Sequence, residues 1–196
     1  MLLLTPLTPE GIPAGALLVA GYIDGQWPNY EKMKQVHPHA YVIPITVTGR
    51  ANVRVADCEK GNLSAPSAAA WAVREIKSGH RPTIYSSVSK KPEIVAELHK
   101  LGLSETLVDW WGAHWFAVGK PPTFTPPIPH GYVAIQFAAN VPHNGHSYDE
   151  TVTNGQWPHP VAAPEQQVHK VSCDLKSCTD PKSSTDVAHL NNPPLL

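Results

Sequence analysis

Residues 53–61 of this chain read VRVADCEKG, a short β-branched run that ends in two carboxylates, Asp57 and Glu59. Successive side chains of a β-strand point to opposite faces, so these two acids are predicted to share one face while Cys58 points to the other. The carboxyl ends of parallel strands are where a β/α barrel keeps its active site. Paired carboxylates are typical of glycosidases. Acids after a strand also occur as turn residues or as charges that begin a helix, so the motif alone leaves both interpretations open.

The length and charge of the chain limit what it can be. With 196 residues it is long enough for one domain with a core and too short for two large ones. Lys and Arg number 15 against 16 Asp and Glu, so the chain lacks the basic excess that nucleic-acid binding requires. No stretch approaches the ~20 apolar residues of a membrane span. We therefore expect a soluble protein that binds neither nucleic acid nor membrane.

The first residues, 1–14, predict an extended leader. They begin MLLL but contain no basic residue, and Pro6, Pro9 and Pro13 interrupt the apolar segment, which is not the pattern of a signal peptide. We expect synthesis in the cytoplasm without a secretion signal.

Apolar runs alternate with helical patterns along residues 15–157, and this alternation is the signature of βα units around a parallel sheet. Each predicted helix has a residue that can end it, such as Gly79 and Gly102. The predicted helices cover residues 29–36, 64–79 and 89–102. The predicted strands cover residues 16–24, 41–47, 53–59, 81–86, 107–115 and 132–137. The fold class is therefore α/β with about six parallel strands, two fewer than a closed eightfold barrel has.

From about residue 158 the chain loses its apolar periodicity, and residues 158–196 are predicted to be a Pro-rich tail without a core of its own. Three cysteines in the whole chain are too few for a disulfide framework. The tail residues His169, Cys173, Cys178 and His189 are of the types that bind zinc, but their spacing matches no common zinc module. We expect neither a metal nor a cofactor.

Six short motifs follow one another in a recognisable order. They are GYIDGQWP (21–28), ADCEKG (56–61), GHRPTIYS (79–86), WWGAHW (110–115), AIQF (134–137) and YD (148–149). Together they resemble the glycoside-hydrolase-like domains of actinobacteria and their phages, which are similar to shortened family 25 lysozymes. The resemblance covers roughly residues 15–157. It implies a shortened, irregular β/α (TIM-like) barrel and cleavage of the β-1,4 bond that follows N-acetylmuramic acid in peptidoglycan.

The resemblance also implies roles for four acids. Asp24 corresponds to the first-strand acid, Asp57 and Glu59 to the Asp-x-Glu pair, and Asp149 to the last-strand acid. Glu59 would be the general acid, with its pKa raised by burial and by the like charge of Asp57. Asp57 would stay ionised and stabilise positive charge at the anomeric carbon, or orient water or the acetamido group of the substrate. We expect Asp24, Asp57 and Glu59 to lie at one end of the sheet.

Four further residues are candidates for binding the sugar. Tyr85, Trp111 and Trp115 would form an apolar floor for the rings, although large aromatic residues are also the usual anchors of a protein core. Gln136 would be either a substrate contact or a buried, hydrogen-bonded core amide.

Two functional hypotheses follow. The first is a peptidoglycan-directed glycoside hydrolase of the lysozyme type, of phage or actinobacterial kind. The second is a catalytically inactive virion or cell-wall-associated protein that binds glycan or is structural, with its tail contacting neighbouring subunits. The second hypothesis arises because the segment between Asp24 and Asp57 is shorter than in the family 25 lysozymes. In addition, those lysozymes tend to have Gln and Tyr at the positions of His114 and Trp115. The cleft distinguishes them, since an enzyme needs an open groove beside Asp57 and Glu59.

Overall fold

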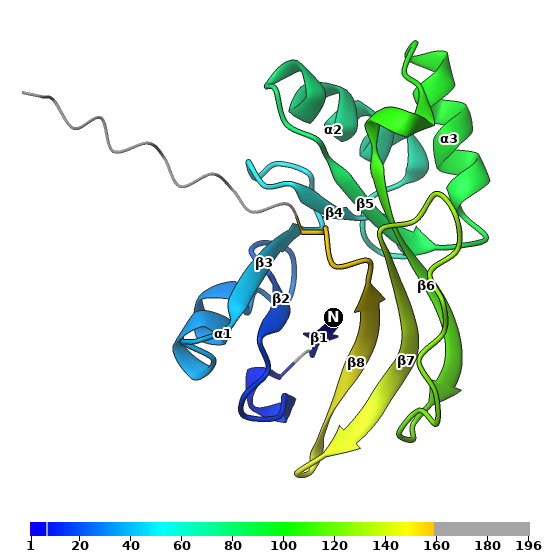
Figure 1. Ribbon diagram of the computed structural model, residues 1–196. Helices are drawn as coiled ribbons and strands as arrows, with labels where there is room; N and C mark the ends of the chain where they lie inside the picture. Colours follow the sequence, from blue (N-terminus) through cyan, green and yellow to red (C-terminus); the bar gives the residue numbers. More distant parts are fainter. Residues whose placement is uncertain (7, 159–196) are drawn as a thin grey trace, which may run out of the picture. The chain divides into compact units, whose positions relative to one another are not determined.

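The computed structural model describes residues 1–6 and 8–158, and these form an eight-stranded closed barrel whose strands follow one another in chain order (Figure 1). The strands are β1 (Leu2–Thr5), β2 (Leu18–Tyr22), β3 (Tyr41–Thr46), β4 (Val55–Asp57), β5 (Thr83–Ser87), β6 (Asp109–Val118), β7 (Ala134–His143) and β8 (His146–Thr153). The helices are α1 (Tyr30–Val36), α2 (Ala65–Lys77) and α3 (Lys91–Lys100), with short 3-10 turns η1 (Pro9–Gly11) and η2 (Glu105–Leu107).

The expected fold class, an α/β barrel, is confirmed. The number of strands differs from the prediction, because one further strand occurs at each end of the domain. The six predicted strands correspond to β2 to β7, which are all parallel. Two further strands close the barrel, β1 parallel to β2 and β8 antiparallel to both neighbours. The barrel therefore has seven parallel strands and one antiparallel strand within the described residues, and the expectation of six was wrong.

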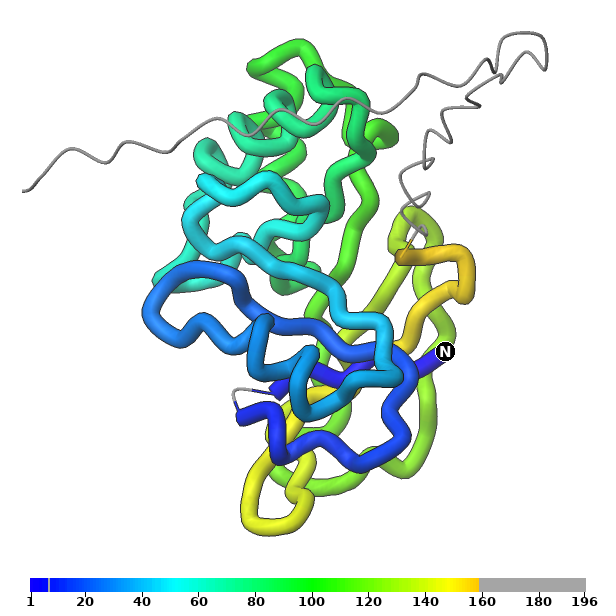
Figure 2. Tube along the Cα trace, turned by 90° about the vertical axis from the view of Figure 1, so that its left-hand side faces the viewer, coloured from blue at the N-terminus to red at the C-terminus, as the bar shows by residue number. Residues whose placement is uncertain are grey.

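The predicted leader, residues 1–14, contains a barrel strand. In β1, Leu2 pairs with Val152 and Thr5 with Asp149 of β8, and Figures 1 and 2 show the N-terminal strand beside β8. Leu3 points into the barrel and is fully buried. The three leucines therefore belong to a strand of the closed barrel, with Leu3 facing its interior, although the run is short and is followed by prolines.

Helices cover only part of the barrel, because only three α-helices occur in the described residues, where an eightfold β/α barrel has eight. Helix α2 begins as predicted, with Ser64 accepting a hydrogen bond from the Ser67 amide at 3.3 Å. Helices α2 and α3 pack against each other outside β4 and β5, while β6, β7 and β8 run side by side as a tall sheet (Figure 1). The β7–β8 hairpin replaces the βα units that would otherwise complete the barrel.

The barrel interior is filled by apolar side chains from most strands. The buried interior residues are Leu3, Leu18, Ala20, Ile43, Ile45, Val55, Tyr85, Trp111, Ala113, Ala134 and Trp157. Trp157, which follows β8, donates a hydrogen bond to Thr83 Oγ1 at 2.9 Å at the first residue of β5. The interior is thus closed at the end where the parallel strands begin, which leaves the opposite end for a site.

Candidate active site

Asp57 lies at the end of β4 and points into the barrel. The alternation predicted from the sequence is present, because Val55 packs inside the barrel while Ala56 and Cys58 pack under α2 and α3. Asp57 is only 1% exposed. Its Oδ2 atom accepts a hydrogen bond from the Tyr22 hydroxyl at 3.3 Å.

Glu59 does not lie on the strand, which corrects the prediction that it shares a strand face with Asp57. Strand β4 ends at Asp57, and the Glu59 carbonyl accepts the Asn62 amide at 3.1 Å in a turn. The turn still brings the Glu59 side chain, which is half-buried, to the pocket at the end of the barrel. Glu59 is therefore positioned by a turn whose geometry the strand pattern does not encode.

Asp149 reaches the same place from β8, held by two hydrogen bonds. Its Oδ2 atom accepts Gln136 Nε2 at 3.0 Å, and its Oδ1 atom accepts the Asn140 amide at 2.8 Å. The register of β7 and β8 shifts between Gln136 and Ala138 and again between Ala138 and Val141, and Asn140 has a positive φ of 54°. This bulge turns the Asn140 N–H toward the Asp149 carboxylate.

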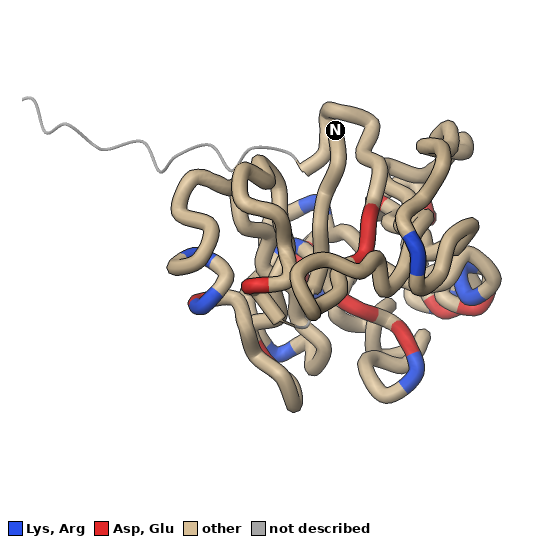
Figure 3. The backbone as a smooth tube through the Cα atoms, turned by 90° about the horizontal axis from the view of Figure 1, so that it is seen from below, with Lys and Arg blue, Asp and Glu red and all other residues tan. Residues whose placement is uncertain are grey.

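A pocket of about 110 Å³ opens where the parallel strands end. Its lining consists of Thr5, Pro6, Tyr22, Ile45, Glu59, Tyr85, Trp111, Trp115, Gln136 and Asp149. Sites that enclose a small molecule usually measure 300–1,000 Å³, so this pocket is too small to enclose a sugar ring. Viewed from below in Figure 3, acidic segments lie around the middle of the molecule, and Lys and Arg lie mainly toward its edge.

Burial and like charges raise the pKa values of the clustered acids. Burial is the main cause for Glu59, followed by the charges of Asp57 and Asp149, and its pKa reaches about 7. Burial also raises the pKa of Asp57 to about 6, although Asn62 and Tyr22 oppose that shift. The pKa of Asp149 is raised by burial as well. The raised pKa of Glu59 agrees with the general-acid expectation, and the ionised state expected of Asp57 is reached only above about pH 6.

The aromatic candidates separate into core and surface. Trp111 is 1% exposed, donates to Thr151 Oγ1 at 3.2 Å and packs edge-on against Tyr85 with ring centroids 4.8 Å apart. Trp111 and Tyr85 are therefore core residues that line the pocket floor. Trp115 is 52% exposed, because the register of β6 against β7 shifts between Ala113 and Ala117. Of the three, only Trp115 presents enough surface for a sugar ring to stack on.

Asp24 lies at the same end of the barrel but outside the acid cluster. Its carboxylate accepts Thr46 Oγ1 and Thr48 Oγ1 at 2.6 Å and the Val47 amide at 2.7 Å. Burial raises the pKa of Asp24, but these hydrogen bonds outweigh it and hold the pKa below its ordinary value. Asp24 lines a neighbouring pocket of about 400 Å³ together with Trp27. It therefore anchors the loop after β3 and lies apart from the cluster of Asp57, Glu59 and Asp149.

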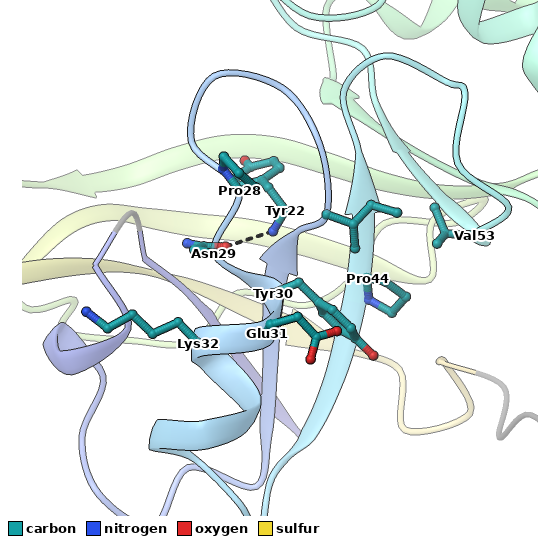
Figure 4. Close-up of a pocket in the computed structure, with 9 residues that line it drawn as sticks. Tyr22, Pro28, Asn29, Tyr30, Glu31, Lys32, Pro44 and Val53 are labelled. Atoms are coloured by element: carbon teal, nitrogen blue, oxygen red, sulfur yellow. Dashed lines mark hydrogen bonds between the residues drawn. The ribbon is translucent and has the colours of Figure 1, made fainter. Parts of the chain in front are cut away.

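Tyr22 was not among the predicted site residues, although it lines both of these pockets. Burial and the nearby Asp57 and Glu59 raise its pKa well above the ordinary value, so its hydroxyl stays protonated and donates to Asp57. Asn29 Oδ1 accepts the Tyr22 amide at 2.8 Å beside a further pocket of about 430 Å³ (Figure 4). Tyr22 stands two positions before Asp24, and residues two apart in a strand point to the same face. This period is the sequence signal that could have identified Tyr22 as a site residue.

Two negative findings apply to residues 1–6 and 8–158. None of their helices has the length and apolar character needed to cross a lipid bilayer. No cluster of three or more His, Cys, Asp or Glu side chains with metal-binding geometry occurs among them. The tail residues considered as zinc ligands, from His169 to His189, lie outside the described part of the chain.

Comparison of this chain with models of protein families, with curated proteins and with solved structures gives no match. The chemistry of the site is therefore argued from its own geometry.

Proposed function

We propose that this protein is a lysozyme-type glycoside hydrolase that acts on the glycan strands of peptidoglycan. The observation that carries the proposal is Glu59, a carboxylic acid that faces an open pocket with its pKa raised to about 7. Such an acid keeps its proton near neutrality and can transfer it to a leaving group. The six motifs follow one another in an order that resembles the lysozyme-like domains, and this resemblance supports peptidoglycan as the substrate.

In the proposed reaction Glu59 protonates the oxygen of the glycosidic bond. As that bond breaks, positive charge develops at the anomeric carbon, and the carboxylates of Asp57 and Asp149 stabilise it. A water molecule then adds to this carbon, and the proton that it releases returns to the acid cluster, which restores the protonated Glu59. Asp57 is buried and acts through its charge without touching the sugar. The same two charges favour the proton on Glu59 before the reaction.

The small pocket implies that the sugar lies across the mouth and not inside it. Trp115 forms part of the lining and is half-exposed, so a ring can stack on its indole while the glycosidic oxygen faces Glu59. Trp27 is 67% exposed beside the larger neighbouring pocket. A polymeric substrate that extends over both pockets fits this surface better than a single sugar does.

Lysis of purified cell walls, followed by turbidity, tests the proposal. Glu59→Gln removes the transferable proton but keeps the shape of the side chain, and we expect it to abolish lysis. Glu97→Gln, on α3 where Glu97 pairs with Lys100, is the matched control and should lyse walls like the wild type. Full activity of Glu59→Gln would place the catalytic acid elsewhere.

A second candidate is a non-catalytic protein that binds cell-wall glycan or serves as a virion or wall component. The observation that favours it is the small volume of the pocket together with the burial of Asp57. A wild type that sediments with insoluble peptidoglycan, but causes no lysis between about pH 5 and 8, would support this candidate against the enzyme. Subunit contacts through the tail concern residues outside the described part of the chain.

A further inference from the structure

Tyr22 reaches the buried Asp57 across the strand that lies between them. In the sheet Tyr22 of β2 pairs with Ile45 of β3, and Ile45 pairs with Val55 of β4. Asp57 stands two residues after Val55 and therefore points to the same face, the barrel interior. The Tyr22 side chain spans this offset, because its hydroxyl lies 3.3 Å from Asp57 Oδ2 and donates to it. One strand thus supplies the donor and another the carboxylate.

The backbone of Tyr22 is fixed by Asn29, a buried residue. Asn29 Oδ1 accepts the Tyr22 N–H at 2.8 Å, and the Asn29 N–H donates to the Tyr22 carbonyl at 2.9 Å. Asn29 Nδ2 also donates to the Pro6 carbonyl, just beyond β1, at 3.0 Å. A Cβ atom on Gly21 would lie 3.1 Å from Asn29 Oδ1, so a glycine there permits the close approach. The Tyr22 hydroxyl is therefore presented to Asp57 from a backbone that is held on both sides.

We propose that Tyr22 is a positioning residue whose hydroxyl holds the Asp57 carboxylate in place and stabilises its negative charge. A hydroxyl that donates to a carboxyl group favours the ionised form over the protonated one. Tyr22 keeps its own proton, because burial and the nearby acids raise its pKa well above the ordinary value. The contact stands on its own geometry, and only its chemical consequence, the charge that Asp57 supplies to the reaction, rests on the proposed function.

Tyr22→Phe removes the hydroxyl and keeps the ring. The ring packs against the barrel interior and lines both the pocket of the acids and the neighbouring pocket that contains Trp27. Phe retains these contacts, so the substitution isolates the hydrogen bond to Asp57 from the packing of the ring.

Other groups near Asp57 act on it in parallel and are unchanged in Tyr22→Phe. Asn62, an uncharged and exposed residue in the turn after β4, also lowers the pKa of Asp57. The charged and titratable groups are Cys58 after β4, Glu59 in the turn, Tyr85 on β5 and Lys90 before α3. A change in the titration of Asp57 in this variant therefore reports the Tyr22 hydroxyl.

Carbon-13 NMR titration of the Asp57 carboxyl group tests the contact without any measurement of lysis. The pKa of Asp57 is about 6 in the wild type, and it should rise by about one unit in Tyr22→Phe because the ionised form loses a donor. Tyr148→Phe is the matched control, since Tyr148 donates to Glu150 Oε1 at 3.2 Å and the substitution removes a similar bond at another carboxylate. Asp57 should titrate in this control as it does in the wild type.

The wild type provides a second measurement, in case Tyr22→Phe does not fold. A hydrogen bond to an ionised carboxylate is stronger than one to a neutral carboxyl group. The NMR signal of Tyr22 Cζ should therefore change with the same midpoint as the Asp57 carboxyl group. In Asp57→Asn the change at this midpoint should disappear. A Tyr22 signal that does not respond to the titration of Asp57 would overturn the proposal.

The rate of wall lysis measures the chemical consequence. Because fewer Asp57 carboxyl groups are ionised at a given pH, Tyr22→Phe should lose about fivefold in rate at about pH 6 and little at about pH 8. A Tyr22 that only supports the packing would lower the rate equally at both pH values, and that result would overturn the proposal. An Asp57 pKa that is unchanged or lowered in Tyr22→Phe, or raised equally in Tyr148→Phe, would also overturn it. A raised pKa in Tyr22→Phe alone, in a protein that lyses no walls, would leave the proposed function alone in error.

Discussion

Replacing Asp57 by Asn is expected to stabilise the protein at neutral and alkaline pH. Asp57 is almost fully buried, and its carboxylate receives the Tyr22 hydroxyl while Oδ1 has no hydrogen-bond partner among the described residues. Asn has the same shape and carries no charge, and its Oδ1 can still accept from Tyr22. The substitution therefore removes the cost of a buried charge while it keeps the packing.

The magnitude follows from the pKa of Asp57, which is raised from 3.8 to about 6. Each pKa unit corresponds to roughly 1.4 kcal/mol, so ionised Asp57 costs the folded state about 3 kcal/mol. Because the folded pKa is the higher one, this cost is absent below about pH 4, grows as the pH rises, and is complete above about pH 6. At about pH 8 the gain amounts to a rise of about 6–12 °C in Tm for a domain of this size.

Urea and thermal unfolding of the wild type and Asp57→Asn at about pH 4 and pH 8 measure this gain. Asp24→Asn is the control, because the lowered pKa of Asp24 means that its carboxylate stabilises the folded state above its unfolded pKa and stops doing so in acid. Asp24→Asn should therefore lose stability at the higher pH. If Asp57→Asn changed the free energy of unfolding equally at both pH values, or lowered it at pH 8, the argument that the ionised Asp57 destabilises the folded state would be refuted.

Three other outcomes are expected. The plot of lysis rate against pH should be a narrow bell. The rate falls below about pH 6 as Asp57 takes up a proton and above about pH 7 as Glu59 loses one, and both values belong to the coupled cluster of acids. A rate that is constant from about pH 5 to 9 would contradict this prediction. Trp115→Ala should weaken sedimentation with cell walls but leave Tm within about 1 °C, since the indole is half-exposed; an equal loss of both would make it a core residue. Leu3→Ala should lower the free energy of unfolding by about 3 kcal/mol in denaturant, and no change would mean that β1 is dispensable.

Local pattern was enough for the middle of the barrel and for the inward direction of Asp57, whereas Asp149 was assigned only through the resemblance. The alternation of Val55 and Asp57 against Ala56 and Cys58 is present as predicted, because one face of that strand packs on helices and the other on the interior. Ser64 and Gly79 delimit helix α2 through local chemistry, a cap and a positive φ.

The two strands that were missed depend on contacts far apart in the chain. Strand β1 pairs with residues near 150, and no local feature of MLLL distinguishes a barrel strand from a leader. Strand β8 reads HSYDETVT, which lacks apolar alternation, and its Asp149 faces the site. A local signal was present in Asn144-Gly145, both with positive φ, which is the pair typical of a tight hairpin.

The pairing of β1 with β8 has a consequence for how the site comes into being. Thr5 and Asp149 are partners across this seam, and both line the pocket. Contacts of such long sequence separation are slow to form, so the two ends of the domain are expected to meet late in folding. Until they meet, Asp149 is remote from Glu59 and both titrate as ordinary acids. Assembly of the barrel thus buries Glu59 and brings the other acids close to it, which raises its pKa and lets it keep the proton that the proposed reaction requires.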